Sequence, residues 1–210
     1  MSLTLVIGSK KWSSWSLRPW IALKQAAIPF KEILIHLRQP DTRARILEYC
    51  PAGKVPILID GKEHVWDSLA ILDYIALRFP EAKLWPTELS AFALAKSISA
   101  EIHGGFTAIR RELSMDIGAE RPTPDLSDEV QAELERLQAI WCDARTRFGS
   151  AGPFLFGRFT NADAMYAPVA TRLRTYQVKV DPVSLAYMNT MLALPAMKEW
   201  YREAVKEEAE

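Results

Sequence analysis

Residues 51–75 read PAGKVPILIDGKEHVWDSLAILDYI, and this stretch decides how the first third of the chain folds. The runs VPILI and EHVW are rich in β-forming residues and stand on either side of Asp60-Gly61-Lys62. An Asp-Gly pair between two such runs is typical of a tight β-hairpin. The following DSLAILDYI has apolar residues at helical spacing, and Pro80 lies beyond its end. The stretch therefore predicts a hairpin that leads into an amphipathic helix.

The preceding residues add two strands and two helices. Residues 3–7 (LTLVI) and 29–37 (PFKEILIHL) are β-rich, whereas 15–26 and 41–50 have helical spacing. Proline is tolerated in the first helical turn, so Pro19 predicts a helix that begins within 13–16, with one of the serines there as its cap. The order βαβαββα predicts a small mixed sheet with helices on both of its faces.

The character of the chain changes after Pro80. Residues 81–90 form a proline-containing linker, and the rest has helical periodicity only. We therefore expect an α/β domain over 1–80 and an all-α domain over 91–210. Helices are predicted over 89–113, 126–148, 160–175, 183–193 and 195–207.

Composition argues against several classes of protein. The 26 basic residues equal the 26 acidic ones, which gives no support for nucleic acid or an anionic membrane surface as a partner. No apolar run reaches the ~18 residues needed to span a bilayer, and the N-terminus lacks the features of a secretory signal, so we expect a cytoplasmic protein. Cys50 and Cys142 form no CxxC pair, and neither a disulfide, a dithiol redox motif nor a metal site is predicted.

Four motifs carry a resemblance to a known family. They are SSWSLRPWIAL (13–23), PAGKVPIL (51–58), DSLAILDYI (67–75) and FLFGRFTNADAMYAPV (154–169). In this order they resemble the soluble glutathione S-transferases, in particular serine-type members similar to the zeta, tau and related bacterial classes. The resemblance implies a thioredoxin-like N-terminal domain, an all-helical C-terminal domain, a homodimer, glutathione as co-substrate and no metal.

The first motif places a catalytic serine. On the family pattern Ser13 takes this position and Ser14 is its neighbour. The glutathione thiol has a pKa near ~8.5, and its thiolate is the nucleophile. A hydroxyl at a helix N-terminus can donate a hydrogen bond to the sulfur anion, and the helix dipole favours the same charge. The plainer interpretation is that these serines only cap the helix.

The second and third motifs imply the glutathione site. Pro56 is expected to follow a cis bond, which presents the backbone of Val55 to the cysteinyl unit of the peptide. Lys54 either meets the glycyl carboxylate or stays solvated. Asp67 is expected to bind the γ-glutamyl ammonium group, and Ser68, at a helix N-terminus, the γ-glutamyl carboxylate.

A second substrate is expected between the two domains. The candidate walls are Trp12, Trp15, His103, Phe106 and Arg110, the last three at spacings of three and four on one face of a predicted helix. For His103 a structural role is the alternative. Two glycines after it are unusual in a helix and suggest close packing or space for a ligand. We assign Thr160 and Asp163 to a structural capping box rather than to catalysis.

The predicted function is a glutathione transferase that attacks a small hydrophobic electrophile. One alternative is a glutathione-dependent isomerase resembling maleylacetoacetate isomerase, although Trp15 stands where zeta enzymes carry a participating cysteine. Cys50 is a further departure, since the family often has Asn or Ser there. The other alternative is a non-catalytic binding module, because a fold alone does not determine function.

Overall fold

The computed structural model describes residues 3–207, and its first half is built on a mixed four-stranded sheet. The strand order is β2-β1-β3-β4. Strand β1 (Leu3–Gly8) pairs in parallel with β2 (Phe30–Ile35) and antiparallel with β3 (Ile57–Asp60). Strand β4 (Glu63–Trp66) completes the sheet as the antiparallel partner of β3. The predicted combination of a βαβ unit and a hairpin is confirmed.

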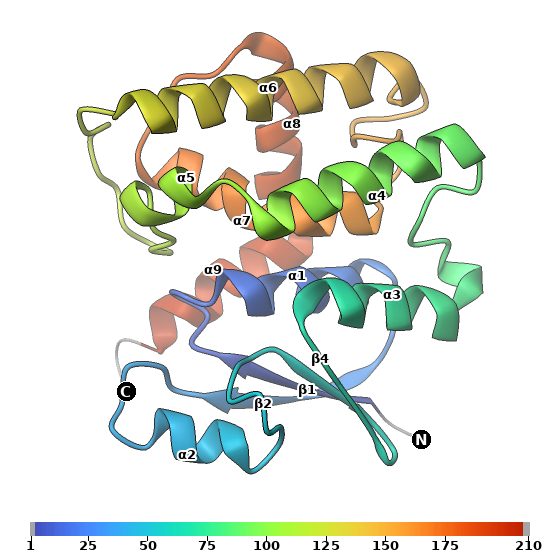
Figure 1. Cartoon of the computed structure of the whole chain (residues 1–210), viewed down its shortest axis with the longest axis vertical. Helices are drawn as coiled ribbons and strands as arrows, with labels where there is room; N and C mark the ends of the chain where they lie inside the picture. Colours follow the sequence, from blue (N-terminus) through green and yellow to red (C-terminus); the bar gives the residue numbers. More distant parts are fainter. Residues whose placement is uncertain (1–2, 208–210) are drawn as a thin grey trace.

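Helices cover both faces of this sheet, as predicted (Figure 1). Helices α1 (Ser14–Gln25) and α3 (Ser68–Arg78) cover one face, where Leu5 and Ile7 join the large core. On the other face, Val6 belongs to a small core with residues of α2 (Thr42–Leu47) and the segment after it. The alternation along β1 follows from the two-residue period of a strand.

The hairpin loop comprises Gly61 and Lys62, because Asp60 pairs directly with Glu63. Gly61 has a φ of +63°, which a glycine adopts without a steric cost. Glycine at the first position of a two-residue loop is typical of a tight hairpin turn. The loop therefore sets the register that brings Asp67 directly after β4.

The second half is helical and stacks on the α1/α3 side of the sheet (Figure 1). A short 3-10 turn (Pro80–Ala82) precedes it. The helices that follow are α4 (Leu89–Gly104), α5 (Thr107–Glu112), α6 (Asp128–Phe148), α7 (Asn161–Thr175), α8 (Pro182–Ala193) and α9 (Pro195–Lys206). Helix α1 packs against α7 and α9, so the two halves share one large hydrophobic core.

The prediction of one helix over 89–113 is wrong. Helix α4 ends at Gly104, and Phe106 has a φ of +58° before α5 begins. A side chain at Gly105 would lie 2.9 Å from the carbonyl oxygen of Glu101, so glycine permits this exit from the helix. Gly104 has open space around it. The helix breaks at Gly105, and the predicted common face of His103, Phe106 and Arg110 does not exist.

The start of α7 is anchored by buried polar contacts. A capping box is present, in which Asp163 accepts hydrogen bonds from the backbone N–H of Thr160 (2.7 Å) and from its hydroxyl (2.9 Å). Asp163 also accepts from the N–H of Leu155 at 3.1 Å. The side chain of Asn161 donates to the carbonyl oxygen of Leu72 on α3, which ties α7 to the sheet half. The N–H of Thr160 is one of the donors that a helix N-terminus otherwise leaves free, and Asp163 satisfies it.

The last helix closes over the start of the chain through charged and aromatic contacts. Lys10 is almost fully buried and forms ion pairs with Glu32 and, at 2.9 Å, with Glu203 of α9. The indole of Trp200 donates to the carbonyl oxygen of Lys10 and packs edge-on against Trp20. These contacts with β2 and α9 therefore restrain the segment that leads from β1 to α1.

Candidate active site

A cleft of about 760 Å³ lies where three loops of the sheet half meet α4. Its polar groups come from the loop before α1, the loop before β3, the start of α3 and the end of α4: Ser13, Lys54, Asp67, Ser68 and His103. Aromatic and aliphatic side chains form the remaining walls: Trp12, Trp15, Leu37, Ile46, Ala52, Val55, Pro56 and Trp66. Polar groups at several points of an otherwise apolar cleft are typical of a small-molecule site.

Ser13 occupies the N-cap position of α1, but its side chain does not cap the helix. Its hydroxyl donates instead to the hydroxyl of Ser16, with 2.7 Å between the two oxygens. The expectation that a serine side chain caps this helix is therefore wrong for Ser13, and its hydroxyl is available to the cleft. Ser14 is also buried, yet it does not line the cleft.

Ser16 is a member of the site that the sequence did not single out. It is fully buried, and its hydroxyl also accepts from the N–H of Gly8 at 3.1 Å. Hydroxyl groups exchange donor and acceptor roles by rotation. When an anion meets Ser13, Ser16 can donate to Ser13 while Ser13 donates to the anion. The three-residue spacing between Ser13, at the N-cap, and Ser16, in the first turn of α1, is the sequence signal that could have identified this pair.

The turn before α3 presents an acid and a hydroxyl. Asp67 has a φ of +73°, and its Oδ1 atom accepts from the N–H groups of Leu69 (2.9 Å) and Ala70 (3.3 Å). Ser68 follows it at the first position of the helix and is buried. The Val55–Pro56 bond is cis, as the motif implied, and places Val55 and Lys54 along the same cleft.

Arg18 supports this corner from inside the protein. It is only 1% exposed, and its guanidinium donates to the Ser68 hydroxyl oxygen at 3.1 Å. Because Arg18 donates, the proton of the Ser68 hydroxyl is free to point toward a ligand. Burial, reinforced by the charges of Arg110 and Arg172, holds the pKa of Arg18 well below its ordinary value. The positive potential here favours an anionic group at Ser68.

Of the predicted electrophile walls, three line the cleft and two do not. Trp12, Trp15 and His103 line it. Phe106 is buried in the core, and Arg110 donates to the backbone carbonyls of Ile102 and Gly105. Both departures follow from the break after Gly104. Trp66, Leu37, Ile46 and Ala52 were missed because their positions depend on how the loops meet.

Two guanidinium groups lie over the indole ring of Trp15. The guanidinium of Arg18 lies 4.2 Å and that of Arg110 4.8 Å from its centroid, while His103 contacts it edge-on at 5.2 Å. Cation–π contacts of this kind restrict the ring. Trp15 therefore forms a rigid wall beside Ser13.

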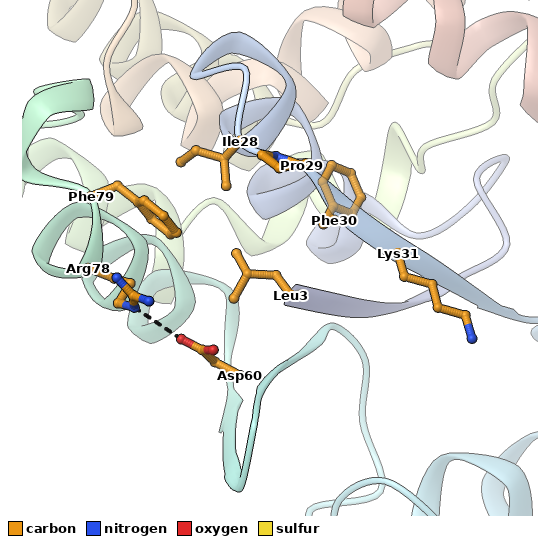
Figure 2. A pocket seen from close by; sticks show the side chains of 8 residues that line it. All are labelled: Leu3, Ile28, Pro29, Phe30, Lys31, Asp60, Arg78 and Phe79. Carbon is orange, nitrogen blue, oxygen red and sulfur yellow. Dashed lines mark hydrogen bonds and ion pairs between the residues drawn. The ribbon is translucent and has the colours of Figure 1, made fainter. Parts of the chain in front are cut away.

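A second hollow, of about 640 Å³, lies at the opposite end of the sheet, where β1 and β2 begin (Figure 2). Leu3, Ile28 and Phe79 give it an apolar lining, and the Asp60–Arg78 ion pair lies at its edge. It contains none of the predicted site residues.

Models of known protein families match both parts of the chain. The model of the glutathione S-transferase N-terminal domain matches residues 12–78, and that of the C-terminal domain matches residues 98–203. The chain belongs to the glutathione S-transferase family. Its mixed sheet and helical second half are the fold of that family.

Individual members of this family are distant from the chain. A zeta-class glutathione S-transferase of Euphorbia esula is 25% identical over 114 residues, 54% of this chain and 51% of that protein. A probable maleylacetoacetate isomerase of Caenorhabditis elegans is 29% identical over 92 residues, 44% of this chain and 42% of that protein. The chain thus spans about half the length of these two curated relatives.

Among solved structures, a glutathione transferase homolog from Burkholderia gl BGR1 with bound glutathione superposes with a TM-score of 0.72. The two chains are 20% identical, and the match covers 98% of this chain and 99% of the other. This similarity shows a shared fold.

Two absences hold for residues 3–207. Within that range no helix is long and apolar enough to cross a bilayer. In the same residues, no three side chains of His, Cys, Asp or Glu gather as metal ligands would.

Proposed function

We propose that this protein is a glutathione transferase in which Ser13 stabilises the glutathione thiolate for attack on a small hydrophobic electrophile. The observation that carries the proposal is the Ser13 side chain, which lines the cleft, leaves its helix uncapped and has Ser16 as a hydroxyl partner. A charge-assisted hydrogen bond from a hydroxyl, together with a helix N-terminus, favours a sulfur anion over a neutral thiol.

The rest of the cleft supports a bound tripeptide. Asp67 suits the γ-glutamyl ammonium group and Ser68 the γ-glutamyl carboxylate, with Arg18 behind Ser68. Val55, before the cis proline, suits the cysteinyl backbone, and Lys54 the glycyl carboxylate. The electrophile is assigned to the aromatic walls formed by Trp12, Trp15 and Trp66.

Titration of the bound thiol tests this proposal. We expect the ultraviolet absorbance of the thiolate to show that the pKa of bound glutathione lies about one to two units below its value in buffer. Such a shift corresponds to about 1.4–2.7 kcal/mol, which a hydrogen bond to an anion and a helix terminus can supply together. A thiol that is no more acidic in the complex than in buffer contradicts the proposal.

A glutathione-dependent isomerase is the second candidate. The similarity to a probable maleylacetoacetate isomerase favours it. Trp15, in the position of the zeta-class cysteine, argues for conjugation instead. Assays with maleylacetoacetate and with a chloronitroaromatic compound on the same preparation separate the two activities, and retention on immobilised glutathione without either activity indicates a binding module.

The proposal includes a homodimer that forms through the α3 and α4 region. Leu77 near the end of α3 is 83% exposed, and Leu89 at the start of α4 is 79% exposed. Exposed apolar side chains mark an interaction surface where they form one contiguous patch. We expect light scattering to give twice the chain mass of 23.8 kDa. Leu77→Glu and Leu89→Glu should each shift the protein toward monomer, and a monomeric wild type contradicts the dimer.

A further inference from the structure

One carboxylate of the cleft, that of Asp67, is contacted by both halves of the molecule. His103, near the end of α4, places its Nε2 atom 3.1 Å from Oδ2 of Asp67, at the start of α3. The other oxygen of Asp67 accepts from Leu69 and Ala70 of its own helix. The helical half therefore holds one oxygen of Asp67 and the sheet half holds the other.

The surroundings of His103 favour its neutral form. A carboxylate only accepts hydrogen bonds, so the proton of the neutral ring lies on Nε2. The Nδ1 atom is buried and has no hydrogen-bond partner among the described residues, so a proton placed there would be an unsatisfied donor. Burial lowers the pKa of His103, as do Arg18 on α1 and Arg110 on α5, whereas Asp67 raises it.

We propose that neutral His103 positions the Asp67 carboxylate for the γ-glutamyl ammonium group, and that protonation of His103 weakens glutathione binding. The inference rests on the proposed function, in which Asp67 receives that ammonium group. Neutral His103 restrains the Asp67 carboxylate by a hydrogen bond and does not neutralise its negative charge. That charge remains available to the ammonium group of the ligand. Protonated His103 brings a second cation to the same oxygen and competes with the ammonium group.

The structure gives His103 a different role from the one predicted from the sequence. In the sequence it was a candidate wall for the electrophile, whereas the contact with Asp67 assigns it to the glutathione end of the cleft. Because Asp67 is partly exposed, a carboxylate without this contact would be hydrated and free to rotate. Binding would then have to order and dehydrate it.

The first experiment measures the affinity of S-methylglutathione, which has no titrating thiol, by calorimetry from about pH 8 to about pH 5. We expect the dissociation constant of the wild type to rise roughly five- to tenfold as His103 becomes protonated. We call this rise in the dissociation constant on acidification the pH step. His103→Gln should lack the pH step, because the glutamine amide nitrogen can donate a hydrogen bond but does not titrate. His64→Gln, which changes an exposed histidine outside the cleft, should retain it.

A ligand variant and an alanine variant complete this experiment. The analogue of S-methylglutathione without the α-amino group should show no step, because it carries no ammonium group to compete with His103. At about pH 7.5, His103→Ala should weaken binding of S-methylglutathione roughly three- to tenfold, and His103→Gln should restore most of the affinity. A step that persists in His103→Gln or with the analogue overturns the inference.

The second experiment uses no ligand and follows the pKa of His103 by NMR. We expect it to fall in Asp67→Asn, because the carboxylate raises it in the wild type. An unchanged pKa overturns the inference, since the contact is then absent in solution. If S-methylglutathione does not bind at any pH, the proposed function fails together with the inference. Binding without a pH step removes the inference alone.

Discussion

Ser13→Ala should lower kcat/KM for conjugation of a chloronitroaromatic compound roughly 10- to 100-fold near neutral pH. The variant removes the one hydroxyl of the Ser13–Ser16 pair that lines the cleft. Without it the bound thiol returns toward its pKa in buffer, and the fraction of thiolate falls. Affinity for glutathione should change little, because the contacts assigned to Asp67, Ser68 and Val55 remain. Steady-state kinetics and calorimetry on the same preparation measure both quantities.

Two matched variants test which serine hydroxyl activates the glutathione thiol. Ser14→Ala should keep nearly wild-type activity, because Ser14 does not line the cleft. Ser16→Ala should cause a smaller loss than Ser13→Ala, since it removes the partner of Ser13 and leaves the N–H of Gly8 without an acceptor. A wild-type rate in Ser13→Ala, or the main loss in Ser14→Ala, would show that another group activates the thiol.

Asp163→Ala should lower the free energy of unfolding by about 3–5 kcal/mol at neutral pH. Asp163 is fully buried, and alanine would leave the N–H groups of Leu155 and Thr160 and the Thr160 hydroxyl without this acceptor. Because α1 packs on α7, the loss should affect the whole molecule. Denaturant unfolding followed by circular dichroism measures the effect.

Asp181→Ala is the matched control for a capping residue near the surface. Asp181 caps α8 through the N–H groups of Val183 and Ser184, but water can replace it there. Its loss should cost about 1 kcal/mol. Equal effects of the two substitutions would show that burial does not determine the value of the Asp163 network.

The same aspartate makes stability depend on pH. Burial raises the pKa of Asp163 from 3.8 to about 6, although the hydrogen bonds that its carboxylate accepts from Leu155 and Thr160 oppose the shift. Its folded pKa is above its unfolded pKa, so the stability that comes from its protonation is full below the unfolded value and is lost as the pH rises through about 6. The hydrogen bonds that the carboxylate accepts remain at neutral pH. Relative to Asp163→Asn, the wild type should lose about 2–3 kcal/mol between about pH 4 and pH 7. A constant difference between the two proteins would contradict the raised pKa.

The sequence by itself determined the elements whose signals lie within a few residues. The Gly61 turn, the start of α3 at Asp67 and the Thr160–Asp163 box depend on local backbone geometry, so neighbouring residues are sufficient to predict them. The order of these elements and the four motifs also predicted the family and the fold.

Only the tertiary structure decided how these elements meet. The glycines after His103 are compatible with a continuous helix as well as with a break. The packing of Phe106 into the core, with its φ of +58°, decides for the break. The contact of His103 with Asp67 and that of Arg18 with Ser68 join segments far apart in the chain, and neither has a local signal. Such contacts depend on which faces the packed core brings together, and this information is not contained in the spacing of residues along one segment.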